Sequence, residues 1–289
     1  MKYMDMIHRL TPLYGREEAR AVCLLLLDEA FGLSQSEVVC GRVEELSEAQ
    51  HHQLEQMAQR LEQGEPVQYV LGRADFGGRA FHVEPGVLIP RPETYELCQW
   101  IIEDHNRPYC ALQPPAPLHV LDIGTGSGCI AVTLALDLWN SSVTAWDISP
   151  DALLIARGNA HRLGATVNFE LYDILDASCQ RQTQGQPVDL IVSNPPYVCE
   201  REKAGMAQNV LGYEPALALF VPDDDPLRFY RAIARHAAEA LQPRGELYLE
   251  INPLYAEELS ALLSASGFQH IEVHEDQFGR QRMMKAQKD

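Results

Sequence analysis

Basic residues are scarce in this sequence, and their scarcity limits what the protein can bind. The 289 residues include 23 lysines and arginines against 41 aspartates and glutamates, a formal net charge of −18. Residues 1–117 hold ten basic and eighteen acidic side chains, and residues 118–289 hold thirteen and twenty-three. Proteins that grip nucleic acid normally concentrate cations on one face, because neutralising phosphates supplies most of the affinity. We therefore expect no direct nucleic-acid partner.

The sequence also lacks the patterns of a membrane protein, a disulfide framework and a zinc site. Its apolar run Leu24–Leu27 is short and is flanked on both sides by acidic residues, which is typical of a buried helix face. The seven cysteines are odd in number, and none forms a C-x-x-C pair. We expect reduced thiols, no metal, no membrane partner and a cytoplasmic location.

Residues 1–65 carry a helical pattern and no group that suggests catalysis. Arg16–Phe31 has a wide apolar stripe, and a helical repeat of apolar residues also precedes Gly64. Capping-box spacing, which marks helix starts, occurs at Ser34/Glu37 and at Ser47/Gln50. The pattern predicts a small helical domain, which is either a structural appendage or a substrate-docking domain.

Residues 66–117 have a different texture and connect this domain to the rest. The runs Val67–Leu71 and Arg79–Val83 flank two glycines, which predicts a β-hairpin. A helix is expected from Arg91 to about His105, and the four prolines of Pro108–Pro117 predict a linker.

Residues 118–289 alternate between strand and helix patterns, which predicts an α/β domain with a mostly parallel sheet covered by helices on both faces. The expected strands are His119–Ile123, Ser142–Asp147, Thr166–Leu171, Val188–Ser193 and Glu246–Ile251, followed by a terminal antiparallel hairpin of Gln269–His274 and Gln281–Ala286. The expected helices are Cys129–Leu138, Pro150–Leu163, Pro226–Leu241 and Leu254–Ser266.

A glycine-rich turn follows the first of these strands. Asp122 precedes it, and the turn itself consists of Gly124, Thr125, Gly126, Ser127 and Gly128. Glycines let the backbone approach a ligand closely, and the helix that follows offers free N–H groups. Asp147 ends the next strand, where an acid can accept hydrogen bonds from ribose hydroxyls or help to cap the helix that begins at Pro150. Asp173 follows the third strand, where an acid can meet an adenine amino group or simply form a turn.

This arrangement resembles the class I S-adenosylmethionine-dependent methyltransferases over residues 118–289. The resemblance implies a Rossmann-like, mostly parallel seven-stranded sheet with an antiparallel terminal hairpin, and S-adenosylmethionine as the cofactor. The residues implied in cofactor binding are Gly124, Thr125, Gly126, Ser127, Gly128, Asp147, Asp173, Ile174 and Asn194. Ile174 departs from the pattern, since many relatives have an aromatic residue there to cover the adenine.

A second motif, Asn194-Pro195-Pro196-Tyr197, follows the buried strand Val188–Ser193. Taken alone, it is compatible with a strand-ending turn. It resembles the N-P-P-Y motif of methyltransferases that act on planar nitrogens. The resemblance implies that the Asn194 side-chain oxygen and the Pro195 carbonyl hold the substrate NH₂ group, that Pro196 lines the substrate site and that Tyr197 packs on the planar group. Asn194, Pro195 and Tyr197 are thus the expected catalytic residues.

Further segments resemble one narrower family over essentially the whole chain. These segments are Gly64–Tyr69, Leu88–Thr94, Asn194–Tyr197, Tyr213–Leu219 and Asp276-x-x-Gly279-x-x-Arg282. They resemble the HemK/PrmC family of protein-(glutamine-N5) methyltransferases. The resemblance implies methylation of the glutamine in the Gly-Gly-Gln motif of class-one peptide chain release factors. We separately expect a monomer. Methylation of a ribosomal-protein glutamine or of an amino group on a nucleic-acid base remains the alternative.

Two further features of the sequence are each compatible with two roles. Glu250, at the end of an expected strand, is compatible with a catalytic or a structural role. Residues 198–211, beside the N-P-P-Y motif, are compatible with a loop that closes over the substrate or with an ordinary surface loop.

Overall fold

The computed structural model describes residues 1–106, 116–176 and 188–289, and the chain forms two compact units. The first unit comprises Met1–Ala74, Val83–Pro85 and Met206–Glu214. The second comprises Asp75–His82, Gly86–Gly205 and Pro215–Asp289. The expected linker Pro108–Pro117 lies almost entirely outside the described residues.

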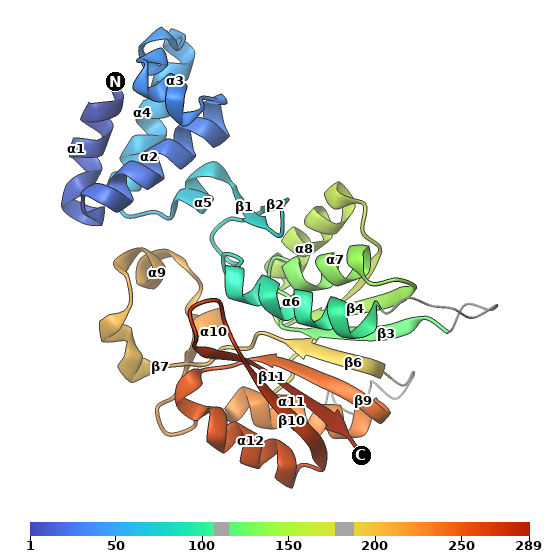
Figure 1. Ribbon diagram of the computed structural model, residues 1–289. Helices are drawn as coiled ribbons and strands as arrows, with labels where there is room; N and C mark the ends of the chain where they lie inside the picture. Colours follow the sequence, from blue (N-terminus) through green and yellow to red (C-terminus); the bar gives the residue numbers. More distant parts are fainter. Residues whose placement is uncertain (107–115, 177–187) are drawn as a thin grey trace. The chain divides into compact units, whose positions relative to one another are not determined.

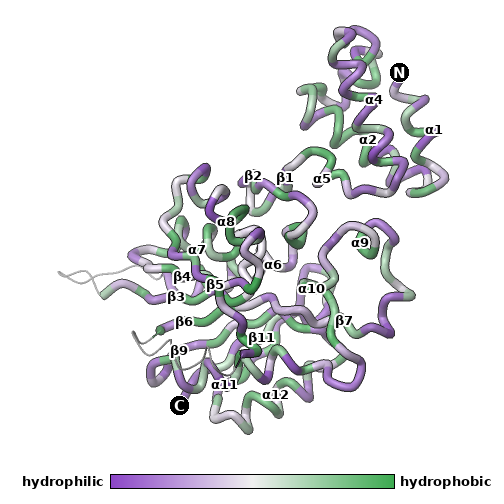
Figure 2. Tube along the Cα trace, turned by 180° about the vertical axis from the view of Figure 1, so that it is seen from behind, coloured by the Kyte–Doolittle hydropathy of each residue, from purple (hydrophilic) through white to green (hydrophobic). Residues whose placement is uncertain are grey.

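The first unit is helical, as the sequence pattern predicts. Its helices are α1 (Tyr3–Tyr14), α2 (Arg16–Phe31), α3 (Gln35–Val39), the 3₁₀ turn η1 (Arg42–Glu45), α4 (Glu48–Glu62), α5 (Val67–Leu71) and α9 (Gln208–Tyr213). Both predicted capping boxes are present, with Ser34 and Ser47 as N-caps. Along α4, hydrophilic and hydrophobic residues alternate with the turn of the helix (Figure 2), and the apolar side packs into the core of this unit.

The hairpin prediction is wrong in its first strand. Val67–Leu71 forms helix α5, and the two-stranded sheet is built from β1 (Arg73–Phe76) and β2 (Arg79–His82). Short apolar runs are compatible with helix or strand, so tertiary contacts decide. Here the Arg60 guanidinium donates to both carboxylate oxygens of Glu65, at 2.6 and 2.7 Å, and to the carbonyls of Tyr69 and Val70 at the end of the helix.

The second unit contains a seven-stranded sheet in the order β10-β11-β9-β6-β3-β4-β5. Its strands are β3 (Leu118–Ile123), β4 (Ser141–Asp147), β5 (Val167–Leu171), β6 (Val188–Ser193), β9 (Leu241–Glu250), β10 (Phe268–Glu275) and β11 (Gln281–Lys288). Pairing is parallel from β5 to β9 and antiparallel on both sides of β11. The predicted sheet and its terminal hairpin are confirmed. A small parallel pair, β7 (Val198–Cys199) and β8 (Phe220–Val221), stands apart.

Helices cover both faces of this sheet (Figure 1). One face carries α6 (Pro92–His105), α7 (Cys129–Asp137) and α8 (Pro150–Leu163), and the other carries α11 (Arg228–Ala240) and α12 (Ala256–Ala265). Short elements complete the unit: η3 (Glu200–Gly205), α10 (Ala216–Leu219) and η4 (Pro253–Tyr255).

The expected helix end at Leu241 is wrong. Leu241 already pairs with Val188 as the first residue of β9, which is longer than predicted. The expected helix over 254–266 is divided between η4 and α12.

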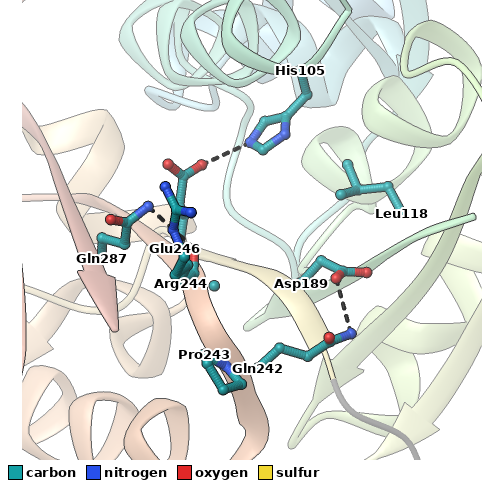
Figure 3. A pocket seen from close by; sticks show the side chains of 9 residues that line it. His105, Leu118, Asp189, Gln242, Pro243, Arg244, Glu246 and Gln287 are labelled. Atoms are coloured by element: carbon teal, nitrogen blue, oxygen red, sulfur yellow. Dashed lines mark hydrogen bonds and ion pairs between the residues drawn. The ribbon is translucent and has the colours of Figure 1, made fainter. Parts of the chain in front are cut away.

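A pocket of about 340 Å³ lies at the amino ends of the central strands, at the end of the sheet opposite to the glycine-rich turn (Figure 3). Beside it, Lys285 Nζ lies 2.8 Å from Asp104 Oδ2 and 3.0 Å from Glu246 Oε1. His105 Nε2 lies 2.9 Å from Glu246 Oε2, and Figure 3 marks this contact with a dashed line. Burial alone raises the pKa of Glu246, but the bonds and charges of His105 and Lys285 outweigh it and lower that pKa to about 2.

We predict that Lys285→Met lowers the free energy of unfolding at pH 7 by about 2–3 kcal/mol, because two acidic groups lose their shared cation. A lowered pKa means that the stabilisation is present above the ordinary pKa of 4.5 and is lost as the pH falls toward 2. Denaturant titrations at pH 7 and pH 3 should therefore show a smaller difference at pH 3. Lys203→Met, which removes the exposed ion pair with Glu200, is the control and should cost less than about 1 kcal/mol. Equal effects of the two substitutions would contradict the prediction.

Candidate active site

The predicted functional residues come together because neighbouring strands end at the same level. Ser193 of β6 pairs with Leu249 of β9 and with Ile123 of β3, and Ile123 also pairs with Trp146 of β4. The next residue of each strand therefore stands at one sheet edge, in the order Glu250, Asn194, Gly124 and Asp147. The chain leaves β3 toward β4 and β5 but later returns on the other side as β6 and β9. Such a reversal of strand order is where open α/β sheets bind ligands.

The glycine-rich turn has a backbone that only glycine adopts without strain. Gly124, Gly126 and Gly128 have φ angles of 77°, 54° and 82°, in the left-handed region. A Cβ at Gly128 would also stand 3.0 Å from the Cβ of Ala156. The turn is tied to β4, since the Gly126 N–H donates to Asp147 Oδ2 at 2.8 Å.

Two buried polar residues outside the turn, Asp122 and Asn159, hold it through hydrogen bonds. The Thr125 hydroxyl donates to Asp122 Oδ2 at 2.7 Å, and both residues are buried. Burial raises the pKa of Asp122 from 3.8 to about 7, although the Thr125 hydroxyl and the Ala131 N–H oppose that shift. On the other side, Asn159 of α8 donates to the Ser127 carbonyl at 2.7 Å.

Asn159 is a supporting residue that the sequence analysis missed. It also exchanges hydrogen bonds with the backbone N–H and carbonyl of His82, at 2.7 and 3.0 Å. The signal for it was an amide side chain in the middle of the apolar face of α8.

The two acids predicted to contact the cofactor, Asp147 and Asp173, lie at the carboxyl ends of β4 and β5, as the sequence predicts. Asp147 ends β4, and its Oδ1 accepts from the Ser149 N–H at 2.9 Å while part of the side chain stays accessible. Burial raises the pKa of Asp147, against the backbone donors that lower it. Asp173 follows β5 and accepts from the Leu175 N–H at 2.8 Å. Ile174 is buried in the core that packs under α11.

The N-P-P-Y motif is joined to the same edge by side-chain hydrogen bonds. The buried Ser193 hydroxyl donates to the Ile123 carbonyl at 2.6 Å, which fixes the end of β6 against the start of the glycine-rich turn. Pro195 is buried, whereas Asn194, Pro196 and Tyr197 are partly accessible.

Two residues that the sequence analysis did not assign complete this half of the site. The Asn194 amide donates to Thr94 Oγ1 at 3.1 Å, and the Tyr197 hydroxyl donates to Glu250 Oε1 at 2.8 Å. The Thr94 hydroxyl in turn donates to Glu250 Oε2 at 2.5 Å. Thr94 belongs to the segment Leu88–Thr94 that carries the family resemblance, but nothing in its spacing showed that it reaches Asn194.

The segment 198–211 is not a single loop. It contains β7, η3 and most of α9, and residues 206–214 belong to the first unit, where the Tyr213 hydroxyl donates to the Gln63 carbonyl at 3.0 Å. Within residues 1–106, 116–176 and 188–289, no cluster of three acidic, histidine or cysteine side chains is suited to hold a metal ion. In those same ranges no helix combines the length and apolar character that crossing a bilayer requires.

The edge fits a nucleoside cofactor. A Cβ built at Gly124 or Gly126 would meet no atom within 4 Å, so the turn leaves open space beside its backbone. Asp147 adds a partly accessible carboxylate next to this space, and a carboxylate has lone pairs left for hydroxyl donors after accepting two N–H bonds.

Comparison with known proteins agrees with the fold and the edge motifs. A family model described as "Methyltransferase domain" matches residues 116–280, and one described as "PrmC N-terminal domain" matches residues 6–72. The structure of a T. thermophilus 16S rRNA N2 G1207 methyltransferase superposes with a TM-score of 0.53 at 21% identity, covering 75% of this chain and 50% of that one. The "delta-N METTL16 MTase domain" gives 0.52 at 17% identity, over 93% and 94% of the two chains. The protein has the class I methyltransferase fold, as predicted.

Closer relatives define the family. The chain is 44% identical to the release factor glutamine methyltransferase of Bacteroides thetaiotaomicron, over 96% of this chain and 95% of that protein. It is 39% identical to the enzyme of the same name from Flavobacterium psychrophilum, over 97% and 95%. The chain belongs to the release factor glutamine methyltransferase family, which confirms the HemK/PrmC resemblance.

We predict that Asp122→Asn gains stability relative to the wild type as the pH rises. A carboxyl group with a raised pKa stabilises the fold fully below its ordinary pKa of 3.8, and this contribution is lost as the pH rises through about 7. Asparagine does not titrate. The free energy of unfolding of the variant minus that of the wild type should therefore rise between pH 4 and 7, by at most about 1.4 kcal/mol per pH unit. Chemical denaturation at several pH values measures it. A difference that is constant over this range would contradict the prediction.

Proposed function

We propose that this protein transfers a methyl group from S-adenosylmethionine to the side-chain N5 of the glutamine in the Gly-Gly-Gln motif of class-one peptide chain release factors. The observation that carries the proposal is the 44% identity to a release factor glutamine methyltransferase over nearly both chains. The shared sheet edge adds support, since it brings the N-P-P-Y motif beside the glycine-rich turn.

We assign the cofactor to the β3–β4 side of the edge. The turn Gly124, Thr125, Gly126, Ser127 and Gly128 would take the backbone-contacting part of S-adenosylmethionine, Asp147 its ribose hydroxyls, and Asp173 and Ile174 the adenine. The bound cofactor supplies an electrophilic methyl group on a sulfonium. Asn194, at the next strand end, closes the cofactor site toward the substrate.

We assign the substrate amide to the β6 side. A glutamine amide nitrogen is a weak nucleophile because its lone pair is delocalised. Asn194 Oδ1 and the Pro195 carbonyl are acceptors for its two N–H groups, and they favour the positive charge that develops on nitrogen. Pro196 and Tyr197 line the site, with the Tyr197 ring against the planar amide. These residues act by orientation and electrostatics, since none of them is a strong base.

We assign recognition of the protein substrate to residues 1–65, with residues 66–117 as the connection and residues 118–289 as the catalytic domain. The release factor is a protein, so an enzyme with a net charge of −18 needs no basic groove to reach it. We further propose that the enzyme is a cytoplasmic monomer.

The direct test of this function is methyl transfer from labelled S-adenosylmethionine to a purified class-one release factor. We expect one label per chain, on the Gly-Gly-Gln peptide, with none on a release factor carrying Gln→Ala. Asn194→Ala should reduce the rate by about 100-fold or more, because it removes an acceptor that acts on the developing charge. Label on a ribosomal protein but not on the release factor would favour that alternative substrate, and label on RNA or DNA alone would contradict the proposal.

The assignment of Asp147 to the ribose has its own test. We predict that the wild type binds S-adenosylhomocysteine about 10- to 100-fold more tightly than its 2′,3′-dideoxy analogue, as expected for hydrogen bonds to a charged acceptor. Asp147→Ala should abolish this preference in calorimetric titrations. If the variant instead weakens both ligands by the same factor, Asp147 acts only by holding the Gly126 N–H.

A further inference from the structure

Four polar side chains form one continuous hydrogen-bonded path that joins Asn194 and Tyr197, the first and last residues of the N-P-P-Y motif, through two buried residues. Thr94 lies in the first turn of α6, Glu250 at the end of β9, and Asn194 and Tyr197 follow β6. Thr94 and Glu250 are each only 2% exposed. The path runs from Tyr197 to Glu250, from Glu250 to Thr94 at 2.5 Å, and from Thr94 to Asn194 at 3.1 Å.

The chemistry of these groups gives the path a direction. An ionised carboxylate only accepts hydrogen bonds, and a hydroxyl has a single proton to donate. The Thr94 hydroxyl must therefore donate its proton to Glu250, and the Thr94 oxygen can only accept a further hydrogen bond. The only group of Asn194 that can donate to that oxygen is its NH₂. The carbonyl oxygen of the amide consequently points to the other side of the Asn194 side chain.

This orientation is the one that methyl transfer to an amide nitrogen requires. Rotating the Asn194 amide by half a turn would place NH₂ where Oδ1 now stands, so that a donor would face the donor NH₂ of the substrate. An isolated asparagine has little preference between the two, because its amide oxygen and nitrogen are nearly the same size.

The path needs Glu250 in its charged form, in which each carboxylate oxygen accepts one hydroxyl proton, from Thr94 and from Tyr197. Burial raises the pKa of Glu250 overall, and the hydroxyls of Thr94 and Tyr197 and the positive charge of Arg282 oppose that rise without cancelling it. A protonated Glu250 would donate to one of the two hydroxyls, and the path would lose its fixed direction.

We propose that Thr94 and Glu250 are positioning residues that hold the Asn194 amide with Oδ1 toward the substrate glutamine. The inference rests on the proposed function, because it assigns a task to Asn194 in that reaction. Neither residue touches the substrate in this account; both act through Asn194.

The test compares two substitutions at position 94 with labelled transfer to the release factor. Thr94→Val keeps the shape but has no acceptor for Asn194 and no donor for Glu250. We expect its kcat to fall about 10- to 100-fold, the effect of a misplaced catalytic group. The KM for the release factor and the Kd for S-adenosylmethionine should stay within about threefold, since binding surfaces are unchanged. Thr94→Ser restores the hydroxyl and should restore kcat.

Thr133→Val is the matched control, because it deletes the hydroxyl of another buried threonine, one with no hydrogen-bond partner among the described residues. It should leave kcat unchanged. The positioning role is refuted if Thr94→Val keeps the wild-type kcat. It is also refuted if Thr94→Val raises KM as well as lowering kcat and Thr94→Ser does not restore them. Absence of transfer by the wild type would instead refute the proposed function.

A second measurement does not depend on activity. In the wild type, ¹⁵N NMR should show one pair of side-chain amide signals for Asn194. Glu250→Gln keeps the volume, but its amide both donates and accepts, so both orientations of Asn194 become satisfied and two pairs of signals should appear. Identical spectra for Asn194 in the two proteins would overturn the inference, even if Thr94→Val does not fold.

Discussion

The site depends on one constraint, the register in which β9, β6, β3 and β4 pair. These parallel strands end at the same level. Four residues that are far apart in the sequence therefore become neighbours along one edge of the sheet: Glu250, Asn194, Gly124 and Asp147. Since successive side chains alternate between faces, a slip of one residue in β6 would turn Ser193 away from Ile123 and move Asn194 from the glycine-rich turn. The bond from the Ser193 hydroxyl to the Ile123 carbonyl locks that register at the point where it matters.

Below the strand ends, buried polar groups hold the two loops that we assign to the cofactor and the substrate. Asp122 and Thr125 fix the glycine-rich turn, and Glu250 and Thr94 fix the N-P-P-Y side. In both places a buried carboxylate accepts a threonine hydroxyl, at the cost of desolvating the acid, as the raised pKa values of Asp122 and Glu250 reflect. Burying these carboxylates costs free energy, and the hydrogen bonds that they accept fix groups that we assign to cofactor and substrate binding.

Much of this was predictable from the sequence because it is encoded locally. The strand endings at Ile123, Asp147 and Ser193 follow from short apolar runs and from the glycine and proline residues after them. What the sequence did not show depends on distant contacts: Val67–Leu71 became a helix through Arg60, and Thr94 meets residues 100 and 156 positions later in the chain. A lone threonine or a strand-terminal glutamate has no pattern that reveals its partner, so only the folded chain identifies them.

The most direct test of the account is a high-resolution crystal structure of the protein with S-adenosylhomocysteine and a Gly-Gly-Gln peptide. We expect the glutamine NH₂ between Asn194 Oδ1 and the Pro195 carbonyl, with the Asn194 amide nitrogen still hydrogen-bonded to Thr94 and the ribose hydroxyls on Asp147. A glutamine bound away from the N-P-P-Y motif, or an Asn194 amide turned with its oxygen toward Thr94, would contradict it.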